Sequence, residues 1–146
     1  QRKRETTKNQ MVTSSLLEAE KRLLGLISQS KKLYKMSSAQ IKAEEFATNV
    51  YRRLAKSMYD SYENGMSPDP AMMLNDFSGD DLSEASEVFY NLEVYSGDEE
   101  TVKELLYTIK LEKLNMRINA EADPTNLMDL FKQREELLNE KNTWEE

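Results

Sequence analysis

The chain has 146 residues, of which 20 are lysine or arginine and 27 are aspartate or glutamate, so its formal net charge is −7. It contains no cysteine and no histidine, which excludes a disulfide framework, a thiolate or imidazole metal site and a Ser-His-Asp triad. An acidic chain without a long apolar run is not expected to bind nucleic acid, to cross a membrane or to carry a signal peptide, so we expect a soluble, cytoplasmic protein.

The first third of the chain predicts a tail followed by helices. Residues 1–10 are polar and basic, which is typical of a flexible linker. Ser15 and Glu18 match the S-x-x-E capping box, and leucines then recur with helical spacing to about Ser28. A polar stretch follows, and we expect a short helix or turn over 42–46.

The middle of the chain contains a strong helix signal and then a stop. Apolar residues over 47–64 follow the i, i+3/i+4, i+7 spacing of a helix. Gly65 stands where a helix usually ends in a left-handed residue. Asp69 is expected to cap a short helix over 71–77, with Pro70 in its first turn.

Three further helices are expected in the rest of the chain. Asp80 or Asp81 should cap the first, which ends before Ser96-Gly97. The second is a long helix from about Glu99 to Ala120 or beyond, whose start is acidic as the helix dipole favours. An Asp-Pro turn then begins the last helix, over 125–141, and the two long helices should form an antiparallel hairpin.

These elements predict an all-α fold, with no strand. We expect a flexible basic tail over 1–10, a helical bundle over 11–110 and a C-terminal helical hairpin with a polar tail over 111–146. The bundle is expected to be followed by a long helix that continues into the hairpin.

Charge is distributed unevenly along the chain. Residues 1–59 carry thirteen basic and five acidic side chains, 60–104 carry one basic and thirteen acidic, and 105–146 carry six basic and nine acidic. These blocks have net charges of +8, −12 and −3. They are typical of solvated helix faces, but the acidic middle would also repel DNA and restrict any contact with it to the first third.

No group of residues predicts catalysis, a metal or a cofactor. Adjacent carboxylates such as Glu44/Glu45 and Glu99/Glu100 resemble the ligands of a di-metal bundle, but that site also needs Glu-x-x-His motifs. We expect these carboxylates to be helix caps or solvated side chains. There is no glycine-rich phosphate loop.

The hairpin is the best candidate for a binding surface. Two helices cannot bury both of their faces against each other, so the outer faces are either covered by the bundle or offered to a partner. Trp144, the only tryptophan, is either an interface anchor or folded back on a nearby groove. The candidate partner-binding residues are Met116, Ile118, Leu127, Leu130, Phe131, Arg134, Leu137, Leu138 and Trp144.

Several segments together suggest a family. The segment 17–27 (LEAEKRLLGLI), Phe46, 51–54 (YRRL), 62–65 (YENG) and Asp69-Pro70 carry the pattern. Over about 16–141, this pattern of apolar positions and breaks resembles the C-terminal helicase-binding domain of bacterial DNA primase.

This resemblance implies a non-catalytic, monomeric interaction domain. Its hairpin would dock on the N-terminal domains of the hexameric DnaB-type replicative helicase, recruiting primase to the replication fork, while its bundle would modulate helicase and primer synthesis. Residues 1–10 would link it to the zinc-binding and polymerase domains of a parent primase, the DNA-directed RNA polymerase of the primosome.

Two alternatives stay open. The N-terminal domain of the replicative helicase shares much of the pattern, including an opening like 18–25 and the helix end at 62–65. The basic tail and an end soon after the last helix favour the primase domain, whereas self-association into a ring would favour the helicase. The alternative from another class is a single-stranded-DNA-binding module that stacks bases on Tyr51, Tyr59 or Tyr62.

Overall fold

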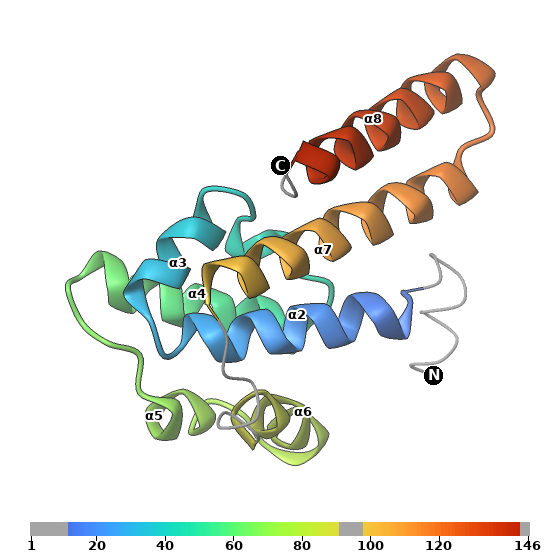
Figure 1. The fold of residues 1–146 in the computed structure, drawn as a ribbon. Helices are drawn as coiled ribbons and strands as arrows, with labels where there is room; N and C mark the ends of the chain where they lie inside the picture. The colour runs from blue at the N-terminus through green and yellow to red at the C-terminus, as the bar shows by residue number, and fades with distance from the viewer. Residues whose placement is uncertain (1–11, 91–97, 144–146) are drawn as a thin grey trace. The chain divides into compact units, whose positions relative to one another are not determined.

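The computed structural model describes residues 12–90 and 98–143, and within them every regular element is helical (Figure 1). The all-α prediction is therefore confirmed. In chain order the elements are α2 (Ser14–Ile27), α3 (Lys31–Ser38), the 3₁₀ helix η1 (Ala43–Glu45), α4 (Asn49–Glu63), α5 (Pro70–Leu74), α6 (Gly79–Tyr90), α7 (Glu99–Ala120) and α8 (Pro124–Asn142). None of the described helices is long and apolar enough to span a membrane.

The start of α2 differs from the prediction. The Thr13 hydroxyl accepts the backbone N–H of Leu16 at 3.1 Å, so Thr13 is the cap and Ser15 already lies in the helix. The same hydroxyl donates to Glu112 Oε1 at 2.8 Å. The capping box expected at Ser15 is therefore wrong, because a residue two positions earlier takes the capping role.

The end of α4 is a Schellman motif, as the glycine predicted. Gly65 has φ +76°, and its N–H donates to the Tyr62 carbonyl at 3.0 Å. The N–H of Met66 reaches back to the Ser61 carbonyl at 2.8 Å. Two carbonyls at the helix end are thereby satisfied, and the chain turns out of the helix.

Aspartates cap three of the remaining helices. The carboxylates of Asp69 and Asp123 accept N–H groups at the starts of α5 and α8, at 3.1 and 2.9 Å, as predicted. Asp98 does the same for α7, accepting the N–H of Thr101 at 3.2 Å, and this bond lowers the pKa of its carboxyl. The prediction for α6 is wrong. The helix begins at Gly79, so Asp80 and Asp81 lie within its first turn instead of capping it.

The chain divides into two compact units. One comprises Glu18–Leu106, and the other comprises Gln1–Leu17 together with Tyr107–Glu146. The predicted division into 11–110 and 111–146 stays a prediction.

Helix α4 is the centre of the unit Glu18–Leu106. It contacts α3, η1 and α6, and its inward face is fully buried. The Tyr62 hydroxyl donates to the Ile27 carbonyl at 2.6 Å, and the Tyr59 hydroxyl donates to the Ile41 carbonyl at 2.9 Å. These two bonds connect α4 to the end of α2 and to the segment that precedes η1.

A second polar link crosses the same core. Glu20, on α2, is fully buried, and its Oε1 accepts the backbone N–H of Ala47 at 2.9 Å. The Thr48 hydroxyl caps α4 by accepting the N–H of Tyr51 and donates to Glu84 on α6. Side chains from three helices thus hold the start of α4 in place.

The second unit contains the predicted antiparallel hairpin. The Arg134 guanidinium donates to Asn115 Oδ1 at 2.7 Å, and the Lys141 ammonium lies 4.4 Å from the centre of the Tyr107 ring. Tyr107 of α7 thus pairs with the later residue of α8, and Asn115 pairs with the earlier one. The two helices therefore run in opposite directions (Figure 1). Leu114 and Leu130 are buried leucines close in sequence to the contact between Asn115 and Arg134.

Candidate functional site

The outward face of α8 carries the most prominent apolar side chains of the hairpin. Phe131 is 43% exposed and Leu138 is 48% exposed, although both are large hydrophobic residues. They are seven residues apart, which places them on one side of a helix. We call Met128, Phe131 and Leu138 the α8 stripe.

The other predicted contact residues are more enclosed. Leu130 is only 4% exposed and belongs to the hairpin interior. Four other candidates are half-buried, so part of each side chain is accessible: Met116, Ile118, Leu127 and Leu137. Trp144 lies outside the described residues. The structure therefore leaves Phe131 and Leu138 as the most accessible members of the predicted set.

Arg134 has a role within the hairpin. Besides its hydrogen bond to Asn115, its guanidinium lies 5.3 Å from the centre of the Phe131 ring. A cation held over a ring restricts where that ring can move. Arg134 therefore supports the position of Phe131 and is only half-buried itself.

Met128 is a member of the stripe that the sequence analysis did not select. Its side chain is 72% exposed, the most of any large apolar residue on α8. The available signal was its spacing, because Met128 precedes Phe131 by three residues on the same helix. A flexible thioether at such a position adapts readily to the shape of a partner.

The tyrosines proposed to stack on DNA bases are not available for stacking. Tyr51, Tyr59 and Tyr62 are 5%, 8% and 7% exposed, and the hydroxyls of Tyr59 and Tyr62 donate to backbone carbonyls in the core. Tyr34 stacks on Tyr62 with ring centres 4.5 Å apart. A base could reach these rings only if the bundle opened, so the single-stranded-DNA alternative loses its stacking residues.

Burial also changes the acidity of these phenols. It raises the pKa of Tyr51 well above its usual range, and the carboxylates of Glu84 and Glu20 add to the effect. Burial likewise raises the pKa of Tyr59 and, to a smaller extent, that of Tyr62. All three side chains are therefore neutral packing groups at neutral pH.

The adjacent carboxylates have local structural partners. Glu45 Oε1 accepts the backbone N–H of Lys42 at 2.7 Å, and Glu99 pairs with Lys32. Within residues 12–90 and 98–143, no three acidic side chains are grouped closely enough to hold a metal ion.

The comparison with protein families gives one match. A family model described as the DnaB-like helicase N terminal domain matches residues 12–113. The match begins just before α2 and ends within α7. No curated protein and no solved structure gives a significant match to the chain.

This match corrects the expected identity. It falls on the N-terminal domain of the helicase and not on the helicase-binding domain of primase. The expected parent primase, with its primosome role, nucleotidyltransferase activity and primer synthesis, is therefore wrong, and so is docking on a separate DnaB-type helicase. The spacing of apolar residues and helix breaks describes a helical bundle that both kinds of domain share, and it does not identify which one a chain contains.

Proposed function

The chain belongs to the family of DnaB-like helicase N-terminal domains, and we propose that it is a non-catalytic interaction domain of a replicative DNA helicase. The observation that carries this proposal is the match over residues 12–113, which includes all of the helices from α2 to α6 and the first part of α7. Its work would be in DNA replication, in the cytoplasm.

The α8 stripe supports a role in assembly. Exposure of Met128, Phe131 and Leu138 on one helix face lowers the solubility of the protein unless another surface covers these side chains. We propose that the occupant is the same stripe of a second copy of the chain. The partner is then another helicase subunit and not a separate protein.

The sequence of α8 is suited to pairing with itself. In a two-fold antiparallel pairing centred between residues 134 and 135, Phe131 of each copy faces Leu138 of the other. The same symmetry brings Arg134 opposite Glu135, so opposite charges meet at the centre. In such an interface a central pair of opposite charges is flanked on each side by a contact between Phe131 of one copy and Leu138 of the other.

Sedimentation equilibrium of the chain at several concentrations tests the proposal. We expect reversible self-association, and we expect Phe131→Ala combined with Leu138→Ala to weaken it by about tenfold or more. Glu136→Ala, an exposed change elsewhere on α8, is the matched control and should leave association unchanged. Far-UV circular dichroism should show the same helicity for all three proteins.

Two results would count against the proposal. If the wild-type chain is monomeric at every concentration, the assembly role of the stripe is wrong. If the double variant associates as strongly as the wild type, another surface mediates assembly.

A further inference from the structure

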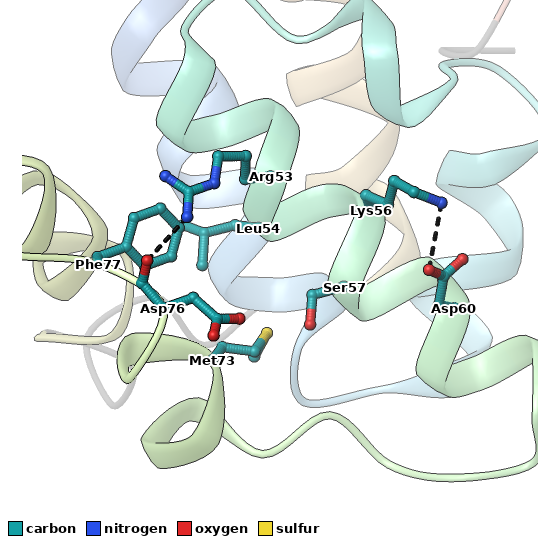
Figure 2. Close-up of a pocket in the computed structure, with 8 residues that line it drawn as sticks. All are labelled: Arg53, Leu54, Lys56, Ser57, Asp60, Met73, Asp76 and Phe77. Carbon is teal, nitrogen blue, oxygen red and sulfur yellow. Dashed lines mark hydrogen bonds and ion pairs between the residues drawn. The ribbon is translucent and has the colours of Figure 1, made fainter.

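The bundle unit has a hollow between α4 and the segment that runs from α5 to α6. Its volume is about 310 Å³, and its lining comes from α4 and from residues 73–77 (Figure 2). The lining residues are Arg53, Leu54, Lys56, Ser57, Asp60, Met73, Asp76 and Phe77. All of them lie within the unit Glu18–Leu106, so the hollow is independent of the hairpin and of the α8 stripe.

The hollow has an apolar floor. Leu54, Met73 and Phe77 are buried and present hydrocarbon and thioether surface to it. Arg53 forms part of one wall. Its guanidinium lies 4.3 Å from the centre of the Phe77 ring and donates to the Asp76 carbonyl at 2.7 Å. The Arg53 guanidinium therefore already has interaction partners within the protein.

Polar groups converge on the same space. Figure 2 shows the Asp76 carboxylate and the Ser57 hydroxyl on either side of the hollow, with Met73 between them. Within the described part of the chain, no ion pair to the exposed Asp76 carboxylate is present. At the far end Asp60 pairs with Lys56 at 3.3 Å, and both side chains are exposed, so this pair is weak and open to competition.

The lining holds the basic Arg53 and Lys56 as well as the acidic Asp60 and Asp76, whereas the sequence that continues from α4 through α5 and α6 is acidic. Between Ser57 and Tyr90 the sequence has eight acidic residues and no basic one. Of those outside the lining, the two nearest to it in sequence are Glu63, at the end of α4, and Asp80, in the first turn of α6. A cation approaching this side of the bundle is therefore attracted, and an anion such as DNA is repelled.

We propose that the α4–α5 hollow is a docking site for a basic amphipathic helix of a partner protein, with one lysine or arginine side chain inserted. The aliphatic stem of that side chain would pack on Leu54 and Met73. Its charged end would bond to Asp76 and Ser57. Helix-in-groove recognition uses this combination of an apolar floor and charged edges.

Two exposed methionines close in sequence to α5 fit a protein partner. Met72 and Met66 are 68% and 60% exposed, and both flank or belong to the α5 region. Methionine side chains adapt to different apolar surfaces, which is useful where a partner helix lies across the rim. The inserted basic residue would give the orientation, and the rim would add apolar contact.

Fluorescence anisotropy on the 146-residue chain tests this site. The probe is a labelled helical peptide with leucine at i, i+3 and i+4 positions and lysine elsewhere. We expect saturable binding that weakens by about tenfold or more in Asp76→Lys, because a repulsive charge replaces an attractive one. Ser57→Leu should weaken binding similarly by filling the hollow, even though it adds apolar surface.

Glu104→Lys is the matched control for charge, because it changes the net charge equally at an exposed position on α7. It should alter the affinity by less than about twofold, since exposed charges far from the site are screened. Equal losses in Glu104→Lys and Asp76→Lys would overturn the proposal, as would absence of peptide binding or tighter binding in Ser57→Leu. Loss of the chain's own self-association in Asp76→Lys would also overturn it, since the hollow would then hold a second copy.

Discussion

At the scale of single residues, the buried tyrosines form hydrogen bonds inside the core of the bundle through their hydroxyl groups. Tyr59 and Tyr62 each place a ring in the core and direct the hydroxyl to a backbone carbonyl. Such a bond contributes about 1 kcal/mol net, and leaving the partner carbonyl unpaired would cost more. The tyrosines therefore define where the end of α2 and the residue Ile41 lie against α4.

The raised phenol pKa values predict a loss of stability at high pH. Folding raises the pKa of Tyr51 and Tyr59 above the ordinary value of 10.0, so the folded state holds these protons more tightly. Their contribution to the free energy of unfolding is complete below pH 10.0 and is lost as the pH rises through the raised values. Urea unfolding at a series of alkaline pH values should show this decline.

A pair of variants separates this effect from general alkaline damage. Tyr51→Phe should make the decline shallower, whereas Tyr90→Phe should not, because Tyr90 is 81% exposed. If every tyrosine in the folded protein ionises together near pH 10.0, followed by the absorbance of the phenolate, the expected protection of the buried phenols is wrong.

A capping residue could be predicted from the sequence only where a single capping candidate precedes the helix. Asp69 and Asp123 each precede a proline, and both were identified as caps from sequence. At α2, Thr13, Ser14 and Ser15 are all possible caps. The hydrogen bond from Thr13 to Glu112 spans 99 residues, and local sequence contains no sign of it.

At the scale of elements, Gly65 decides how α4 ends. Its φ of +76° is in the left-handed region, and a Cβ added there would meet no atom within 4 Å. Gly65→Ala should therefore lower the free energy of unfolding by about 1 kcal/mol through the backbone alone, without a steric clash. Urea unfolding monitored by circular dichroism measures this difference.

Gly65→Asn is the control for that experiment. Asparagine tolerates the left-handed conformation better than alanine, so its loss should be the smaller of the two. An alanine variant as stable as the wild type would show that the Schellman motif is not maintained in solution.

Element boundaries were predictable where apolar spacing and caps agreed. Helix α7 was predicted from about Glu99 to Ala120 or beyond, and its bounds are Glu99–Ala120. Helix α3 was not assigned from the sequence, because lysine and serine dominate it. Leu33 and Tyr34 could be predicted as its apolar anchors and are buried, whereas its cap Ser30 becomes evident only in the structure.

Spacing alone could not separate the two sides of α8. Leu130 and Phe131 are neighbours, yet one lies inside the hairpin and the other is exposed. The direction of α7 decides which side is covered. Sequence could therefore identify the hairpin as a candidate surface and name Phe131 and Leu138, but it also named the buried Leu130 and did not name Met128.

At the scale of the whole molecule, the uneven charge predicts a response to salt. The −12 block over 60–104 places many like charges on one part of the chain, and screening reduces their repulsion. Raising sodium chloride from about 0.01 M to about 0.15 M should increase the melting temperature by a few degrees, measured by circular dichroism.

Exposed ion pairs oppose this effect. Lys32 with Glu99 and Lys56 with Asp60 would be weakened by the same salt, although exposed pairs contribute little. A melting temperature that falls with salt would show that these pairs outweigh the repulsion. Sucrose, which carries no charge, is a control for general solute effects.

The identity of the domain was the part of the molecule that sequence patterns left unsettled. Apolar spacing, glycine ends and aspartate caps describe a bundle with a hairpin, and the structure has both. The helicase domain and the primase domain that binds it meet the same physical requirements for packing helices. The distinction therefore depended on the family match.

The two polar contacts along the hairpin have a consequence for the evolution of this domain. Tyr107 with Lys141 and Asn115 with Arg134 lie eight residues apart on α7 and seven on α8, so together they select one register. A substitution at either residue of a pair removes its contact with the residue on the other helix. Among descendants of this sequence, 107 should therefore change together with 141, and 115 with 134, while the turn between the helices is free to vary except at Asp123, which caps α8.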